Sequence, residues 1–171
     1  LKDILLRSNR LTGTIPSELA LLTGLQDDDS AATTSSTEGL ARLWLDDNPL
    51  SGSIPSELGL LSTSLAELSL SYTDLSGSVP SQLGLLENLT LLHLSETDLS
   101  GTIPTELGSL TSLVSITFED TSLTGPVPDE LCDATSPSFL SCDVETTGVC
   151  GCGCVCPVRR EVTPPTNTPT R

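Results

Sequence analysis

A repeat of 24 residues is the feature that most constrains the fold of this chain. When the apolar-Pro dipeptides are aligned, five of them share one column, with spacings of 39, 25, 24 and 24 residues. They are Ile15-Pro16, Ile54-Pro55, Val79-Pro80, Ile103-Pro104 and Val127-Pro128. The repeats define five coils, of which one carries a 15-residue insertion and one a single extra residue near Thr63. Self-similarity at such a period indicates an array of stacked units, each of which buries its apolar face against its neighbours.

The apolar residues change period within each unit. Leucines separated by one residue, such as Leu92 and Leu94, place both side chains on the inner side of a short strand. Leucines spaced by three follow the proline, as in Leu83 and Leu86, and predict a helical or 3-10 return. We therefore expect one continuous core that contains Leu43, Leu45, Leu68, Leu70, Leu92, Leu94, Ile116 and Phe118.

The unit L-x-x-L-x-L-x-x-N/T-x-L-S/T-G-x-I/V-P resembles the leucine-rich repeat family. Its L-S/T-G-x-I/V-P segment is similar to the plant-type subclass, which occurs in receptor-kinase ectodomains and in cell-wall polygalacturonase-inhibiting proteins. The resemblance covers residues 1 to about 131. It implies an α/β solenoid, in which a right-handed coil has a parallel β-sheet on its concave face and a 3-10 or irregular convex side.

One column departs from the family pattern. Asn9 and Asn48 hold the position of the usual buried asparagine ladder, whereas Thr73, Thr97 and Thr121 replace asparagine in the last three coils. Because threonine has one donor and a shorter reach, we expect a weaker ladder in those coils.

We divide the chain into three parts: the repeat array at 1–131, a Cys-rich cap at 132–156, and a Pro/Thr-rich linker or stalk at 157–171. The polar stretch 26–39 has no apolar period, which predicts an exposed inserted loop. Its three consecutive aspartates at 27–29 lack the alternation of a calcium loop, so we assign no metal there. Leu1 begins a coil in register with Leu40, and we expect the natural protein to extend upstream.

All six cysteines lie within 25 residues, a density that suits an oxidising compartment. They are Cys132, Cys142, Cys150, Cys152, Cys154 and Cys156. Cys132 and Cys142 resemble the paired-cysteine cap of secreted family members, which implies a disulfide that closes the last coil. For the other four, disulfides are favoured over a metallothionein-like metal cluster, because no further His or Cys supports a closed metal site. The pairing stays open, since six cysteines allow fifteen connectivities.

The charge balance narrows the choice of partner. The chain has 23 acidic against 7 basic residues, a net charge of −16, and no base among the 116 residues between Arg42 and Arg159. Nucleic acid and anionic membrane surfaces are therefore disfavoured. No apolar run approaches the roughly 18 residues that span a bilayer. We expect a secreted or cell-surface protein that carries a glycan on Asn88, in the sequon Asn88-Leu89-Thr90.

Residues between and just after the leucine pairs point outward in the family geometry and form columns about 4.8 Å apart from coil to coil. We call these columns the concave face. It collects the only Trp, Tyr and His and seven carboxylates from Asp46 to Asp120, with no Lys or Arg after Arg42 in those four coils. The predicted binding site consists of Trp44, Asp46, Asp47, Ser69, Tyr72, His93, Glu96, Asp98, Glu119 and Asp120. We predict that a basic protein or peptide docks there, with Trp44 and Tyr72 as anchors; the alternative is a solvated acidic sheet without a partner.

Catalysis is disfavoured. Ser69 and His93 are column neighbours, with Glu67 or Glu119 not far away, but an open sheet provides neither an oxyanion hole nor a water-excluding pocket. We therefore expect no enzyme activity and no cofactor.

Two further functions remain as alternatives. The family resemblance implies a secreted inhibitor of a cell-wall glycan hydrolase as the runner-up. Surface or ice recognition would use two parallel hydroxyl rows formed by Thr12-Gly-Thr14, Ser51-Gly-Ser53, Ser76-Gly-Ser78 and Ser100-Gly-Thr102, which Pro126 interrupts.

Overall fold

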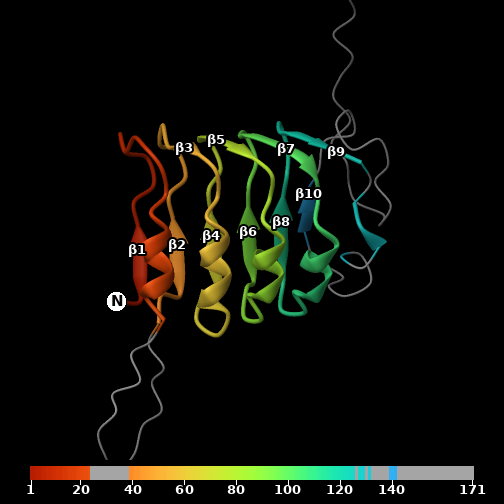
Figure 1. Cartoon of the computed structure of the whole chain (residues 1–171), viewed down its shortest axis with the longest axis horizontal. Helices are drawn as coiled ribbons and strands as arrows, with labels where there is room; N and C mark the ends of the chain where they lie inside the picture. Colours follow the sequence, from red (N-terminus) through yellow and green to blue (C-terminus); the bar gives the residue numbers. More distant parts are fainter. Residues whose placement is uncertain (24–38, 126, 130, 132–138, 142–171) are drawn as a thin grey trace, which may run out of the picture.

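Short parallel strands, one in each coil, form the main sheet (Figure 1). The computed structural model describes residues 1–23, 39–125, 127–129, 131 and 139–141. Along the sheet the strands are β1 (Asp3–Leu5), β2 (Arg42–Trp44), β4 (Glu67–Ser69), β6 (Leu91–His93), β8 (Ser115–Thr117) and β10 (Phe139–Ser141). Strand β10 was not predicted: it lies in the segment expected to be the Cys-rich cap, and it pairs in parallel with β8.

The register of this sheet agrees with the repeat alignment. Leu43 pairs with Leu68, Leu68 with Leu92, and Leu92 with Ile116. Their side chains are fully buried, and they belong to one apolar cluster that runs from Ile15 to Leu131. The predicted core is thus confirmed for all eight of its residues, each of which is no more than 5% exposed.

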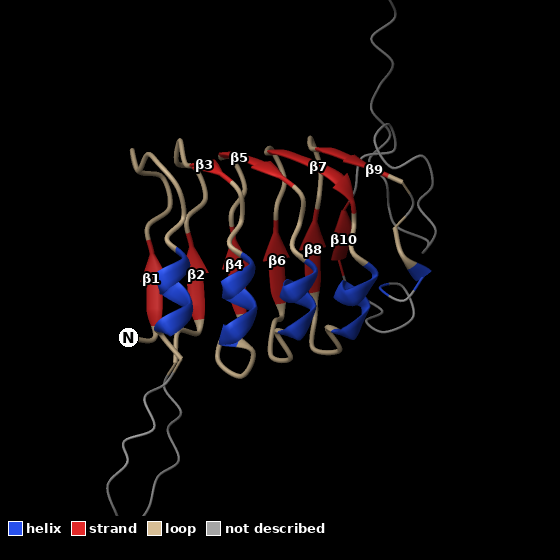
Figure 2. Ribbon diagram, viewed as in Figure 1, coloured by secondary structure: helices blue, strands red, loops and turns tan. Residues whose placement is uncertain are grey.

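The return segments are short 3-10 helices that cover the opposite side of the coils (Figure 2). They are η1 (Ser17–Leu21), η2 (Ser56–Leu61), η3 (Ser81–Leu85) and η4 (Thr105–Ser109). Each follows a proline in an extended conformation. The proline ring fixes φ and provides no N–H donor, which suits the residue just before a helix begins. Among the described residues, no helix is long and apolar enough to span a membrane.

A second parallel sheet runs along one edge of the coils and was not predicted (Figure 2). Its strands are β3 (Ser51–Gly52), β5 (Asp74–Gly77), β7 (Asp98–Thr102) and β9 (Ser122–Thr124). The pairing is staggered, so that Ser51 lies beside Asp74 and Ser76 lies beside Asp98. The hydroxyl rows predicted along this edge therefore run obliquely, with a carboxylate beside Ser51 and Ser76 and a serine beside Ser100.

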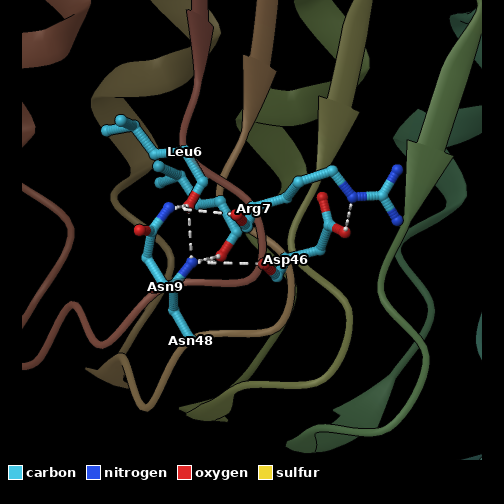
Figure 3. Close-up of polar contacts among 6 residues, drawn as sticks. Leu6, Arg7, Asn9, Asp46 and Asn48 are labelled. Atoms are coloured by element: carbon cyan, nitrogen blue, oxygen red, sulfur yellow. Dashed lines mark hydrogen bonds and ion pairs between the residues drawn. The ribbon is translucent and has the colours of Figure 1, made fainter.

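The ladder column has two kinds of hydrogen bonding, of which Figure 3 shows the asparagine kind. The Asn48 amide donates to the carbonyls of Leu6, Leu45 and Asp46 at 2.9, 2.9 and 3.2 Å, and its oxygen accepts from the Leu11 N–H at 3.0 Å. Thr73, Thr97 and Thr121 each donate one short bond, of 2.8 to 2.9 Å, to the carbonyl three residues earlier. Threonine thus satisfies fewer backbone groups than Asn48 does, in the direction of the weaker ladder that we expected.

Candidate functional site

The strands of the main sheet hold the concave-face residues at alternate positions. Trp44 on β2 and His93 on β6 are half-buried, because neighbouring side chains on the sheet cover part of each ring. Ser69 on β4 lies between them in the same column and is only 8% exposed. The expectation that this whole column faces solvent is therefore wrong at Ser69, where a small side chain sits below two large ones, and at Thr117 of the next strand, which is 9% exposed.

The second column contains an ion pair that the sequence analysis missed. The Arg7 Nε lies 3.1 Å from the Asp46 Oδ2, and the Asp46 side chain is 7% exposed (Figure 3). The guanidinium carbon of Arg7 also lies 5.8 Å from the centroid of the Trp44 ring. Asp46 is therefore not the solvent-exposed carboxylate that we expected. The signal was in the alignment, since Arg7 and Asp46 occupy one column, but the count of carboxylates began at Asp46.

The third column has an unusual backbone conformation. Its five members have φ between 50 and 57°, in the left-handed region; they are Ser8, Asp47, Tyr72, Glu96 and Asp120. All five are exposed, and Tyr72 retains 62% of its accessible surface. These residues form a rim beside the sheet, at the corner where each coil turns out of its strand. Aromatic and acidic side chains at this corner present their polar or flat surfaces to solvent.

His93 contacts a serine, but not the one that a hydrolytic triad needs. Its Nε2 lies 3.0 Å from the Ser115 Oγ on the neighbouring strand. Burial lowers the pKa of His93 below 6.5, and the nearby charges of Asp46 and Glu67 oppose this effect. The imidazole is thus held toward its neutral form. Its described hydrogen bond joins it to Ser115 instead of Ser69, so the structure gives no support to a Ser69–His93 pair.

The floor of the face also contains charged and unpaired polar groups. Arg42 donates to both oxygens of Asp3, at 2.9 and 2.7 Å, which raises the pKa of Arg42 and lowers that of Asp3. Among the described residues, the indole Nε1 of Trp44 and the Oε2 of Glu67 are buried without a hydrogen-bond partner. Buried polar atoms of this kind are uncommon and call for an explanation.

The remaining predicted residues are placed as follows. Asp98 is exposed at the start of β7, and Glu119 is half-buried after β8. Asn88 is exposed before β6, and its amide donates to the Thr63 carbonyl at 2.7 Å. Three predicted features lie outside the described residues. They are the six cysteines, nearly all of the inserted loop (residues up to 38), and the 157–171 stalk. Within the described ranges, no group of three or more acidic, His or Cys side chains is placed to hold a metal ion.

Comparison with known proteins agrees with this geometry. The family model described as Leucine Rich Repeat matches residues 1–22, 39–61 and 88–110. The BIR3–SERK2 complex from Arabidopsis thaliana contains a chain with 32% identity and a TM-score of 0.67, and the match covers 88% of this chain and 70% of that one. This chain therefore belongs to the leucine-rich repeat family. Its repeats are of the plant type that is found in receptor-kinase ectodomains.

Other similar structures come from longer proteins. The Arabidopsis receptor kinase HAESA, solved with the peptide hormone IDA and the co-receptor SERK1, has 29% identity and a TM-score of 0.70 over 82% of this chain and 22% of that one. A plant ice-binding protein has 32% identity and a TM-score of 0.69 over 82% of this chain and 40% of that one. The chain spans about a fifth of the length of the peptide-hormone receptors that it matches. No curated protein shows significant sequence similarity to it.

Proposed function

We propose that this chain is an extracellular module of a receptor-like or secreted recognition protein, and that it binds a basic protein or peptide on its concave face. The observation that carries the proposal is the arrangement of Trp44 and Tyr72 among carboxylates. Both aromatic side chains lie on one side of the coils, one on the sheet and one on the rim, in a chain of net charge −16. Receptors of this family bind peptide hormones and co-receptors in solved complexes, which supports the same class of function here.

The two kinds of residue have different roles in the proposal. Charges on an open sheet are screened over about 8 Å at physiological salt, so the acidic residues mainly speed the approach of a basic partner. Aromatic anchors that become desolvated in the complex mainly slow its dissociation. The proposed contact residues are the predicted ten, of which Asp46 and Ser69 are covered in this structure: Trp44, Asp46, Asp47, Ser69, Tyr72, His93, Glu96, Asp98, Glu119 and Asp120.

The proposal is tested by capture of a partner from extracellular extract, followed by binding kinetics at increasing salt. Trp44→Ala should increase the dissociation rate more than Glu96→Gln does, whereas Glu96→Gln should mainly slow association. Glu106→Gln is the matched control, because Glu106 is exposed on η4, on the side of the coils opposite to the main sheet. Binding that survives both Trp44→Ala and neutralisation of the acidic columns would move the site to the convex side or to the 26–39 loop.

Tyr72→Gly separates binding from folding. A left-handed φ of 57° suits glycine better than tyrosine, so this substitution should leave the fold as stable or slightly more stable. It should nevertheless weaken the partner complex, because the exposed ring is lost. If the wild-type chain and Tyr72→Gly bound the partner with equal affinity, Tyr72 would be excluded as an anchor. If the captured partner is a secreted glycan hydrolase whose activity falls on binding, the inhibitor alternative is the correct one.

Ice or surface recognition is the second candidate, because one of the similar structures is a plant ice-binding protein. The second sheet exposes serine and threonine hydroxyls at Ser51, Ser53, Ser100 and Thr102. Thermal hysteresis of the purified chain would support this function, and its loss in Thr102→Lys would locate it on the second sheet. Absence of thermal hysteresis would exclude the candidate.

Secretion makes two chemical predictions about this chain. Cys132 should pair with Cys142, and thiol counting by mass spectrometry that finds six free cysteines in secreted material would contradict this. Asn88 should carry a glycan in a eukaryotic secretory host, since its side chain is exposed. A glycosylated amide keeps one N–H, which is what the bond to the Thr63 carbonyl requires.

A further inference from the structure

We propose that Trp44 and Asp46 form a subsite for an arginine side chain of the partner, and that the chain's own Arg7 occupies this subsite in the absence of a partner. The inference rests on the proposed function and names the chemistry of one of its contacts. The structure supplies the model of the bound group, because Arg7 already shows how a guanidinium sits between an indole ring and a carboxylate.

The contacts of Arg7 define what the subsite recognises. Its Nε lies 3.1 Å from the Asp46 Oδ2, and its guanidinium carbon lies 5.8 Å from the Trp44 ring centroid. A flat cation that faces an indole and meets a carboxylate at its edge gains from both contacts. A lysine ammonium is a compact, strongly hydrated charge and matches this arrangement less well. The subsite should therefore prefer arginine to lysine.

The two halves of the ion pair differ in burial. The Asp46 side chain is 7% exposed, whereas the Arg7 side chain is 59% exposed. The carboxylate is thus a fixed part of the sheet, and burial makes it costly to leave that carboxylate without a cation. The Arg7 side chain lies largely in solvent, so its guanidinium can be exchanged for an equivalent group.

A second ion pair in the same coils shows how loosely Arg7 is held. Arg42 contacts both oxygens of Asp3, through its Nε and one terminal nitrogen. Arg7 contacts Asp46 through Nε alone among the described ion pairs. Paired contacts of the Arg42 kind add geometric specificity and strength, so Arg7 is the easier of the two to displace.

Two buried polar atoms without a partner lie on the strands of the subsite and its neighbour. The indole Nε1 of Trp44 lacks an acceptor, and the Oε2 of Glu67 on the adjacent strand lacks a donor, among the described groups. Both atoms are covered by the surrounding side chains, so they do not define the ligand. The contacts of Arg7 with Trp44 and Asp46 do, and they indicate an arginine-containing peptide as the ligand class.

Self-occupancy by Arg7 lowers the affinity that a partner experiences. A ligand that binds only the open form loses affinity in proportion to the fraction of molecules that are open. If Arg7 leaves the subsite open for about one-tenth of the time, its removal should tighten binding about tenfold.

The chain's only tryptophan makes the subsite directly measurable. Trp44 is the sole source of indole fluorescence and of the indole N–H signal in a nitrogen-15 correlation spectrum. The full chain would be titrated with three capped tripeptides, which carry arginine, lysine or citrulline between two glycines. The variants are Arg7→Ala, Arg7→Gln and the matched control Arg10→Ala, since Arg10 is exposed in the same coil and removes the same charge. Thermal melting would verify that each variant is folded.

The expected result is that both Arg7 variants bind the arginine peptide about tenfold more tightly than the wild-type chain and Arg10→Ala do. The lysine peptide should bind several-fold more weakly, and citrulline should not bind measurably. Adding Asp46→Asn to Arg7→Ala should abolish the gain.

The inference is overturned if the Arg7 variants bind no more tightly than Arg10→Ala, or if arginine and citrulline peptides bind alike. These outcomes are separate from the capture experiment. A subsite that binds the arginine peptide while no basic partner is found would contradict the proposed function alone, and a basic partner whose affinity is unchanged by Arg7→Ala would contradict the subsite alone.

Discussion

The second coil and the later coils use the same ladder column in different ways. In the second coil, Asn48 bonds to Leu6 and Leu11 of the preceding coil as well as to two carbonyls of its own. Thr73 and Thr97 bond only to carbonyls three residues earlier in their own coils. At this position the asparagine therefore joins two coils, whereas threonine only closes a turn.

The 3-10 returns show the reverse pattern: neighbouring coils approach more closely in the later coils than in the first. A Cβ at Gly59 would lie 2.5 Å from the Gln82 carbonyl of the next coil, and a Cβ at Gly84 would meet the Glu106 carbonyl. The first coil has Ala20 at the equivalent position, where its methyl group is accommodated and buried. The same repeat unit is therefore joined to its neighbour by a side-chain amide between the first and second coils, and by close backbone approach at the next two interfaces.

The largest expected effect comes from the core that both regions share. Leu92→Asp should destabilise the chain by about 4 kcal/mol, because it places an unpaired charge at a fully buried site. Circular dichroism and thermal melting measure the loss. Leu85→Asp is the control, since Leu85 is 57% exposed and its change should be nearly neutral. Equal melting of the Leu92→Asp and wild-type chains would show that the repeat register is wrong.

Exchange of the ladder residues tests the difference directly. Asn48→Thr should cost about 2 to 3 kcal/mol, since it removes the bonds to the preceding coil as well as some within its own. Thr97→Val removes one bond and should cost about 1 kcal/mol. Urea unfolding of the two variants measures both values. If they were equal, the link between the coils would contribute nothing to stability.

The close returns predict a steric effect. Gly84→Ala should cost about 2 kcal/mol, because the new methyl group meets the backbone of the next coil. Gly13→Ala provides a matched substitution in the first coil, where nothing lies within 4 Å of the added Cβ and only the left-handed φ of 88° opposes it. We expect that variant to lose about 1 kcal/mol, and a larger loss at Gly13 than at Gly84 would reverse the comparison.

The smallest effect concerns pH and is confined to the later coils. Because burial lowers the pKa of His93, the folded chain binds fewer protons at this site than the unfolded chain does. Stability should therefore fall as pH decreases below 6.5, until His93 is protonated in the folded state as well. His93→Gln should flatten this part of the stability profile, measured by urea unfolding at several pH values. An unchanged profile would mean that other groups set the acid response.

Much of the fold follows from residues whose environment repeats. Leu43 and Leu92 are predictable because a period of two within the strand and a 24-residue spacing between coils place them in the core. The buried threonines follow from the same alignment. The second sheet was missed because its strands contain Ser, Gly and Asp, which have low strand propensity; backbone pairing between coils forms them instead. Strand β10 was missed because Phe139–Ser141 lies outside the repeat pattern.

The candidate site was less predictable, because it depends on single contacts. The alignment placed Trp44, His93 and Asp46 in their columns. It did not predict that Arg7 would contact Asp46 in its own column and the Trp44 ring in the next. The cover of Ser69 depends on the size of its neighbours, and the choice of Ser115 by His93 depends on a side-chain rotation. Periodicity fixes which residues share a column, whereas rotamers decide which of them touch.

The left-handed corner has a consequence for how this protein can change. Five consecutive coils make the same backbone turn with Ser8, Asp47, Tyr72, Glu96 and Asp120, whose side chains have almost nothing in common. The turn is thus specified by the rest of the coil, and the corner tolerates a hydroxyl, a carboxylate or an aromatic ring alike. Substitutions at this position alter the chemistry of the rim while the core beneath it stays the same. Heritable changes at the corner can therefore alter the surface chemistry of the rim one residue at a time without a change in folding.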